Sequence, residues 1–303
     1  MYITMDMGST NTRAVLCGDD GKIIKRVAAQ SGVRTTVFYG KDALFDKTKG
    51  LLSLVMTDSV RFIVVSGMAT SELGLCEAAH IPLAAGIGKL SHAVVKKKIE
   101  RLSNVPFYFI PGLKKLENGV LADMMRGEET ELFGCIEGDG CYLLPGTHNK
   151  TVIVKDGVIA DFSTSMSGEI LRAVMENTML KEAVSFDSPI SEDYLKHGAE
   201  YGRKNGLNAA AFRVRILSKH EESDMSKTTS FLMGAVLGQD IDSIKKSAGG
   251  MTVYVAGNAK LKRVYSVLLD GCKVLPLSEE KCSDASHLGA VKIIGKYLAE
   301  HNE

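Results

Sequence analysis

A short polar segment near the start of the chain has the residue types that bind nucleotide phosphates. It reads Asp-Met-Gly-Ser-Thr-Asn at residues 6–11 and follows a run of mostly apolar residues. Gly8 allows backbone N–H groups to approach a phosphate closely, and Ser9, Thr10 and Asn11 add short donors. Asp6, at the end of the apolar run, is placed to hold Mg²⁺ through water. A polar hairpin with an Asx turn would use the same residue types, so this structural alternative stays open.

A second loop of this kind lies in the other half of the chain. It contains Pro145, Gly146, Thr147 and His148 and again separates two apolar runs. Two such hairpins, one in each domain, would clasp a polyphosphate in the cleft between the domains, where small ligands usually bind. The pair therefore favours a nucleotide site over two unrelated polar turns.

A group of carboxylates between the two loops could provide a general base. Residues 124–134 read Met-Met-Arg-Gly-Glu-Glu-Thr-Glu-Leu-Phe-Gly and are consistent with a helix from about Glu128. A carboxylate at the cleft floor would accept the proton of an attacking hydroxyl, with Glu128 as first choice and Glu129 and Asp123 as alternates. Arg126 would bind an anion. The helix macrodipole also favours carboxylates in a first turn, so a purely structural role is the alternative.

A glycine near the C-terminal end marks a candidate adenosine site. Residues 255–258 read Val-Ala-Gly-Asn, at the end of an expected strand and the start of an expected helix. Gly257, after Ala256, would let a flat purine pack against the backbone. A plain helix N-cap at Asn258 explains the same residues equally well.

Composition and absent motifs exclude several other classes. The sequence has no P-loop, no dinucleotide-binding Gly-x-Gly-x-x-Gly after a strand and no His-Glu-x-x-His motif. Its six cysteines lie far apart, which favours reduced thiols over a disulfide or zinc framework. A net charge of +1 predicts no nucleic acid partner. No apolar run is long enough for a membrane span, and no signal peptide is recognisable, so we expect a cytoplasmic protein that acts on a small molecule.

An approximate internal repeat predicts how the loops are positioned. In each half a strand enters the polar loop, a second strand follows, and an Asp-Gly turn leads to a third strand. The expected strands cover residues 2–6, 12–17 and 22–28, and then residues 141–144, 150–154 and 158–162. Alternating helices and strands follow, among them helices over 42–56 and 286–300. We therefore predict an α/β fold with two similar domains, residues 1–138 and 139–303.

The motifs resemble those of the superfamily that contains actin, hexokinase, the Hsp70 ATPase and glycerol kinase. The pattern Asp-x-Gly-Ser-Thr-Asn-x-Arg, which ends at Arg13, looks like its first phosphate motif. Residues 127–134 and 145–147 resemble its base-bearing helix and second phosphate hairpin. Residues 255–257 are similar to its adenosine motif.

One family, the 2-dehydro-3-deoxygalactonokinases, resembles this chain more closely and over essentially its whole length. Its members show Met-Arg-Gly-Glu-Glu-Thr, here residues 125–130, and Pro-Gly-Thr-His-x-Lys, here residues 145–150. A third stretch, Ser-Gly-Glu at residues 167–169, also matches. The chain departs from the family at Met7 and Thr151, where aromatic residues are common, and it has no Trp.

The family resemblance implies a fold and a reaction. The fold would be two ribonuclease H-like domains, with mixed five-stranded sheets and helices, around a nucleotide-binding cleft. The reaction would be the ATP- and Mg²⁺-dependent phosphorylation of 2-dehydro-3-deoxy-D-galactonate to its 6-phosphate. A kinase for another sugar or sugar acid, and a non-catalytic ATP-binding sensor, are the alternatives. A homodimer is an assembly that the sequence leaves open.

The same resemblance implies roles for particular residues. Asp6 would position Mg²⁺, and Arg126 would bind the substrate carboxylate. Ser167 and Glu169 are further substrate-binding candidates. The expected nucleotide contacts are Asp6, Gly8, Ser9, Thr10, Asn11, Arg13, Gly146, Thr147, His148, Lys150, Ala256, Gly257 and Asn258.

Overall fold

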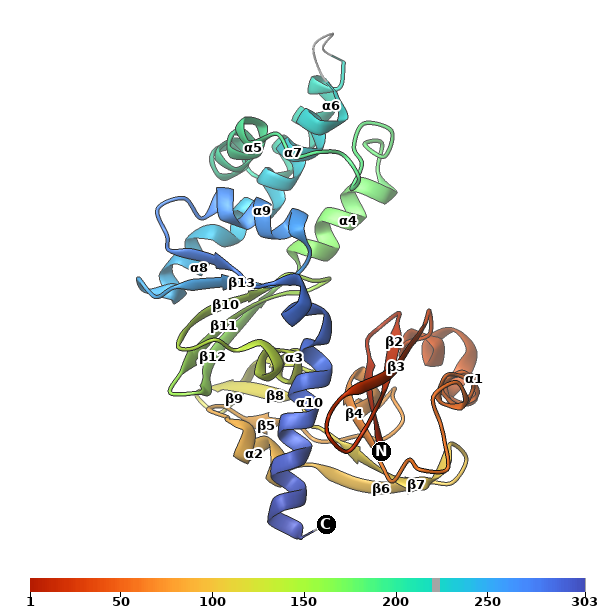
Figure 1. The fold of residues 1–303 in the computed structure, drawn as a ribbon. Coiled ribbons are helices and arrows are strands. Elements are labelled where there is room, and N and C mark those ends of the chain that lie inside the picture. The colour runs from red at the N-terminus through yellow and green to blue at the C-terminus, as the bar shows by residue number, and fades with distance from the viewer. Residues whose placement is uncertain (220–223, 303) are drawn as a thin grey trace. The chain divides into compact units, whose positions relative to one another are not determined.

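The computed structural model describes residues 1–219 and 224–302, and contacts divide the chain into two compact units (Figure 1). The first unit comprises Met1–Gly138, Asp156–Asp161 and Glu280–Glu303. The second comprises Asp139–Lys155 and Phe162–Glu279. Within the described ranges, no helix combines the length and apolar character that a membrane span requires.

The first unit is built on a six-stranded mixed sheet with the order β3-β2-β1-β4-β7-β6. The strands are β1 (Tyr2–Met7), β2 (Thr12–Cys17), β3 (Ile23–Ala29), β4 (Ile63–Gly67), β6 (Val95–Ile99) and β7 (Ser103–Phe109). Strand β1 is antiparallel to β2 and parallel to β4, which is parallel to β7. Alternate residues of β1 face opposite sides of the sheet, so Ile3 and Met5 join a core with Leu44 of the first helix. Asp6 faces the other side.

The first unit also contains several helices and a small second sheet. The helices are α1 (Arg34–Ser53), η1 (Met68–Thr70), α2 (Ile87–His92), α3 (Glu128–Cys135) and α10 (Glu279–His301). A small sheet contains β5 (Ile81–Pro82), β8 (Leu113–Glu117) and β9 (Val120–Met125). Helix α3 lies directly against α10 (Figure 1), because a Cβ atom on Gly134 would lie 1.8 Å from the carbonyl oxygen of Ala285. Only a glycine allows this approach, so α10 constrains the position of α3.

The second unit repeats the strand order of the first. Its sheet has the order β12-β11-β10-β13-β14, with β10 antiparallel to β11 and parallel to β13. The strands are β10 (Gly140–Leu144), β11 (Asn149–Lys155), β12 (Val158–Ser165), β13 (Val253–Val255) and β14 (Val274–Pro276). This repeat confirms the predicted mixed α/β fold. The first sheet has a sixth strand, β6, beyond the five that were expected.

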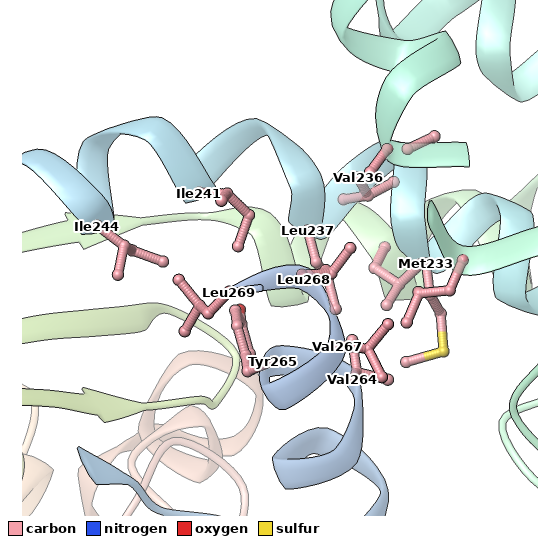
Figure 2. Packing of buried hydrophobic residues seen from close by; sticks show 14 of the residues in the cluster. Met233, Val236, Leu237, Ile241, Ile244, Val264, Tyr265, Val267, Leu268 and Leu269 are labelled. Carbon is pink, nitrogen blue, oxygen red and sulfur yellow. The ribbon is translucent and has the colours of Figure 1, made fainter. Parts of the chain in front are cut away.

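Helices pack closely in the second unit. They are α4 (Ser167–Asn177), α5 (Glu192–Asn205), α6 (Leu207–Leu217), α7 (Met225–Leu237), η2 (Gly238–Asp240), α8 (Ile241–Ala248) and α9 (Ala259–Leu268). Figure 2 shows buried apolar side chains of α7, α8 and α9 in one cluster, among them Leu237, Ile241 and Leu268. This core supports the sheet from which the second polar loop emerges.

Candidate active site

The first polar loop is a tight hairpin between β1 and β2. The N–H of Gly8 donates to the carbonyl oxygen of Asn11 at 2.8 Å. The chain returns to the hairpin after β3, where the N–H groups of Val33 and Arg34 donate to the carbonyl oxygens of Gly8 and Ser9 at 3.1 and 3.0 Å. These hydrogen bonds hold the hairpin backbone in place, while the side chains of residues 9–11 stay exposed. An exposed, preorganised set of short donors suits a phosphate.

Asp6 is half-buried at the carboxyl end of β1, close to two glycines. A Cβ atom on Gly67 would lie 2.8 Å from its Oδ1 atom, and one on Gly127 would lie 4.0 Å away. Burial raises the pKa of Asp6, although the charge of Arg13 and a hydrogen bond with Ser286 act in the opposite direction. Arg13 is its direct neighbour in β2. Ionised Asp6 at this hairpin therefore carries a desolvation penalty, which a bound cation would reduce.

The three candidate bases lie in different surroundings. Glu128 is partly exposed at the start of α3, and its charge acts on Asp6, so the two carboxylates are close. Its Oε2 atom accepts the N–H of Arg126 at 2.9 Å. Glu129 is 0% exposed, and Asp123 lies on β9, where it accepts the N–H of Met124 at 2.7 Å. Only Glu128 of these three combines an accessible side chain with proximity to Asp6.

The carboxylate of Glu129 is used within its own helix start. Its two oxygens accept the N–H of Gly127 at 3.0 and 2.8 Å, and Oε1 also accepts the hydroxyl of Thr130 at 2.9 Å. Burial, with the charge of Glu128, raises the pKa of Glu129 to about 8. These contacts describe a helix-capping carboxyl group, consistent with the structural alternative for this cluster.

Arg126 holds a neighbouring loop. Its Nη1 atom donates to the carbonyl oxygens of Thr70 and Ala78 at 2.6 and 3.1 Å, and its Nη2 atom lies 3.0 Å from Nδ1 of His80. Both terminal nitrogens are therefore engaged by the chain itself. The role of Arg126 in binding a substrate carboxylate stays a prediction, and the contacts indicate a positioning role.

Sequence reasoning missed Glu131, which lies one turn after Glu128 on α3. Burial, with the nearby charges of Asp6 and Glu128, raises the pKa of Glu131 to about 7. The spacing of three between the two glutamates was the available signal, since such residues share a helix face.

Sequence reasoning also missed a cavity of about 500 Å³ beside Asp6 and Arg13. Ser286 and His287 of α10 line it too. No local pattern could place residues from the end of the chain next to β1.

In the second unit, the other polar loop is organised by hydrogen bonds. The N–H of Gly146 donates to Oδ1 of Asn149 at 3.1 Å, and the N–H of Glu169 donates to the carbonyl oxygen of Thr147 at 2.8 Å. Nε2 of His148 lies 2.9 Å from Oε2 of Glu169. The structure thus brings together the loop residues and one of the two substrate candidates on α4.

Lys150 and Ser167 are more enclosed. Lys150 is 4% exposed, donates to Oγ1 of Thr164 at 2.7 Å and lies 6.0 Å from the ring centre of Phe162. The hydroxyl groups of Ser167 and Ser165 are 2.7 Å apart. Both candidates lie near the loop, with their polar atoms in hydrogen bonds of the chain.

The candidate adenosine segment lies beside the second loop. Gly257 has a φ of +94°, and a Cβ atom there would lie 3.7 Å from Cδ of Pro145. The N–H of Ala256 donates to the carbonyl oxygen of Leu143 at 2.9 Å. Asn258 caps α9, with Oδ1 accepting the N–H of Leu261 at 2.9 Å. The side chain of Asn258 is therefore the N-cap of the alternative interpretation, while the glycine backbone remains available to a ligand.

The carboxylates of the first unit fit a hydrated Mg²⁺ ion. Within residues 1–219 and 224–302, no three His, Cys, Asp or Glu residues form a group that could hold a metal. Mg²⁺ in phosphoryl-transfer sites keeps several waters and uses one or two carboxylates together with phosphate oxygens. The half-buried carboxylate of Asp6 matches that donor set, with phosphate oxygens and waters as the other ligands.

Comparisons with known proteins give matches along nearly the whole chain. A family model described as 2-keto-3-deoxy-galactonokinase matches residues 6–292. A Rhizobium meliloti protein named "Probable 2-dehydro-3-deoxygalactonokinase DgoK1" is 30% identical over 279 residues, which is 89% of each chain. An Escherichia coli K12 protein named 2-dehydro-3-deoxygalactonokinase is 27% identical over 256 residues, 80% of each chain.

Solved structures show the same fold. A Sinorhizobium meliloti candidate 2-dehydro-3-deoxygalactonokinase aligns with a TM-score of 0.79 and 23% identity, over 97% of this chain and 99% of that one. The activator of 2-hydroxyisocaproyl-CoA dehydratase from Clostridium difficile, solved with bound ADPNP, aligns with a TM-score of 0.56 and 12% identity. It covers 100% of this chain, and this chain covers 97% of it.

Proposed function

The chain belongs to the 2-keto-3-deoxy-galactonokinase family, and we propose that it transfers the γ-phosphoryl group of ATP to the 6-hydroxyl of 2-dehydro-3-deoxy-D-galactonate. The observation that carries this proposal is the family match over residues 6–292, which includes both polar hairpins. The products are ADP and the 6-phosphate. The proposed location of the enzyme is the cytoplasm, where ATP is supplied.

The nucleotide contacts are proposed separately for each unit. In the first unit, residues 8–11 and Arg13 bind phosphate oxygens, and Asp6 holds Mg²⁺ through water. The ion, when bound, neutralises charge that develops on the phosphates. In the second unit, residues 146–148 and Lys150 also bind phosphate, and residues 256–258 bind the adenosine. The tight glycine-containing backbone of both loops supports these assignments.

Glu128 is the proposed general base. Its carboxylate takes the proton of the 6-hydroxyl as the bond from that oxygen to the γ-phosphorus forms and the bond from the γ-phosphorus to the bridging oxygen of ADP breaks. The transition state of phosphoryl transfer is loose, so a base of ordinary strength is sufficient and its position matters most. The partly exposed carboxylate of Glu128, close to Asp6, supports the choice over buried Glu129.

A coupled ADP-release assay with Mg·ATP and a panel of sugars and sugar acids tests this function. Release confined to 2-dehydro-3-deoxy-D-galactonate is the expected result. ADP release with another hydroxyl compound instead would exclude the proposed substrate but would still support kinase activity. Tight ATP binding without release for any acceptor would contradict the enzyme and favour a nucleotide-dependent sensor.

Four variants test the residue roles in the same assay. Asp6→Ala should abolish turnover with the fold intact, and wild-type turnover would exclude its role with Mg²⁺. Glu128→Gln should lower kcat by about a hundredfold or more, with ATP affinity little changed. If Glu129→Gln or Asp123→Asn has that effect instead, the base is assigned to the wrong carboxylate.

A further inference from the structure

A sugar acid needs a cationic partner for its carboxylate, and the arginines near the first hairpin differ in what they already bind. Both terminal nitrogens of Arg126 are engaged by the loop over residues 70–80. Arg13 lies opposite Asp6 in the sheet and lowers the pKa of that carboxyl group. Arg126 is therefore not available to a carboxylate without giving up hydrogen bonds within the chain, and Arg13 is paired in register with the carboxylate-bearing Asp6.

Arg34 differs from these two arginines. Its backbone N–H donates to the carbonyl oxygen of Ser9 at 3.0 Å, which places the residue directly beside the phosphate hairpin. Its side chain is exposed, and its guanidinium carbon lies 5.3 Å from the ring centre of Phe38. In the part of the chain that the structure describes, no side chain or carbonyl group forms a hydrogen bond or ion pair with this guanidinium.

The segment that carries Arg34 is tied to the loop that follows η1. The hydroxyl of Thr36 donates to the carbonyl oxygen of Leu73 at 2.8 Å, and Nζ of Lys41 donates to that of Glu72 at 3.2 Å. The Thr36 bond holds the start of α1, and the Lys41 bond holds the helix just after its kink at Gly40, where φ is 83° and ψ is 165°.

The same loop leads back to the candidate catalytic groups. Helix η1 begins directly after Gly67, where an added Cβ atom would lie 2.8 Å from Oδ1 of Asp6. A Cβ atom on Gly127, the residue before Glu128, would lie 3.0 Å from the Cα atom of Gly67. Gly67, at the start of the segment over residues 67–73, therefore lies beside both Asp6 and the residue that precedes Glu128.

We propose that Arg34 binds the carboxylate of the sugar acid and so selects acids over neutral sugars. This inference rests on the proposed function and names the substrate contact of the same site. A planar guanidinium binds a carboxylate through two parallel hydrogen bonds. The Phe38 ring, next to Arg34, orients the guanidinium plane. The backbone hydrogen bond from Arg34 to Ser9 fixes the position from which the side chain extends.

The test compares Arg34→Met with a matched control, Arg61→Met. Arg61 is also exposed and lies over a phenyl ring, 5.9 Å from the centre of Phe62, but it precedes β4 at the other end of the sheet and pairs with Asp19. Arg34→Met should raise the KM for the accepted sugar acid by about tenfold or more. ATP affinity, measured by calorimetry without the acid, should stay within about twofold. Arg61→Met should leave both values unchanged, and Arg34→Lys should recover part of the loss.

The outcomes separate this inference from the proposed function. An unchanged KM for the sugar acid in a folded Arg34→Met protein overturns the inference, as does a loss confined to ATP affinity, which would make Arg34 a phosphate ligand. If the wild-type enzyme accepts a different sugar acid, the proposed substrate fails, and a raised KM for that acid still supports Arg34. If the wild-type enzyme accepts only neutral sugars, both fail.

Discussion

Because α10 packs closely against α3, we predict that adding one methyl group to α10, at Gly289, will displace the candidate base Glu128 on α3. A Cβ atom on Gly289 would lie 1.7 Å from the carbonyl oxygen of Thr130 and 3.1 Å from the backbone nitrogen of Gly134. Thr130 belongs to the first turn of α3, two residues after the candidate base Glu128. Gly295 lies on the same helix as Gly289, and nothing lies within 4 Å of an added Cβ atom there.

The expected losses of stability and turnover follow from how far an added Cβ atom on Gly289 would overlap the carbonyl oxygen of Thr130. A carbon atom needs about 3.3 Å from a carbonyl oxygen, so Gly289→Ala must push α3 and α10 apart locally by about 1.5 Å. Overpacking of this kind costs about 3 kcal/mol. A misplacement of about 1 Å at a reacting group lowers turnover by about a hundredfold. Gly295→Ala should instead gain up to about 1 kcal/mol, because alanine favours the helix.

Guanidinium denaturation and steady-state kinetics on the two variants measure both effects. The expected result is a lower free energy of unfolding and a lower kcat for Gly289→Ala, with neither loss for Gly295→Ala. If Gly289→Ala is as stable and as active as Gly295→Ala, then α10 does not determine the position of α3 and the reasoning is refuted.

Three further changes test individual contacts. Arg126→Met should lower the free energy of unfolding by about 3 kcal/mol, because buried carbonyl groups such as that of Thr70 lose a charged donor; a raised KM for the sugar acid with unchanged stability would instead make Arg126 the carboxylate ligand. Glu129, whose pKa is raised from 4.5 to about 8, should reduce stability progressively as the pH rises through that range, since only the folded state resists its ionisation. Urea denaturation at pH 5 and pH 9 should show that decline in the wild type and a smaller one in Glu129→Gln, and equal declines would contradict it. His148→Gln should raise the KM for ATP and change stability by less than about 1 kcal/mol, because its contact with Glu169 is exposed; an unchanged KM for ATP would exclude His148 from the nucleotide site.

Local sequence was sufficient to predict the two hairpins and the repeated sheet. The turn residues after Asp6 and after Pro145 lie between strands of alternating apolar residues, and hairpins form from such short-range signals. The structure and the family match confirm the fold class, the enzyme class and the family. The assignments of site residues, including Asp6 and Glu128, stay predictions.

Contacts between distant segments could not be predicted in the same way. Nothing near Arg126 in the sequence shows that Thr70 and Ala78 engage its guanidinium. Gly134 and Gly289 have meaning only when α3 and α10 are side by side. Such interactions depend on loop closures over long stretches of chain, which periodicity does not encode.

The helix predicted from residue 42 corresponds to the part of α1 that follows the kink at Gly40, and the preceding part, which begins at Arg34, was not predicted. The kink at Gly40 interrupts the apolar pattern there, and exposed side chains precede it. Arg34 was therefore not recognised as a site residue from the sequence.

Identifying the product of the wild-type enzyme would decide between the proposed phosphoryl transfer and its alternatives. The protein is incubated with Mg·ATP and 2-dehydro-3-deoxy-D-galactonate, and the product is examined by phosphorus–proton correlation NMR. We expect one ADP for each acid consumed and a phosphorus signal coupled to the protons on C6. An absence of ADP formation, or a phosphate on any other oxygen, would contradict it.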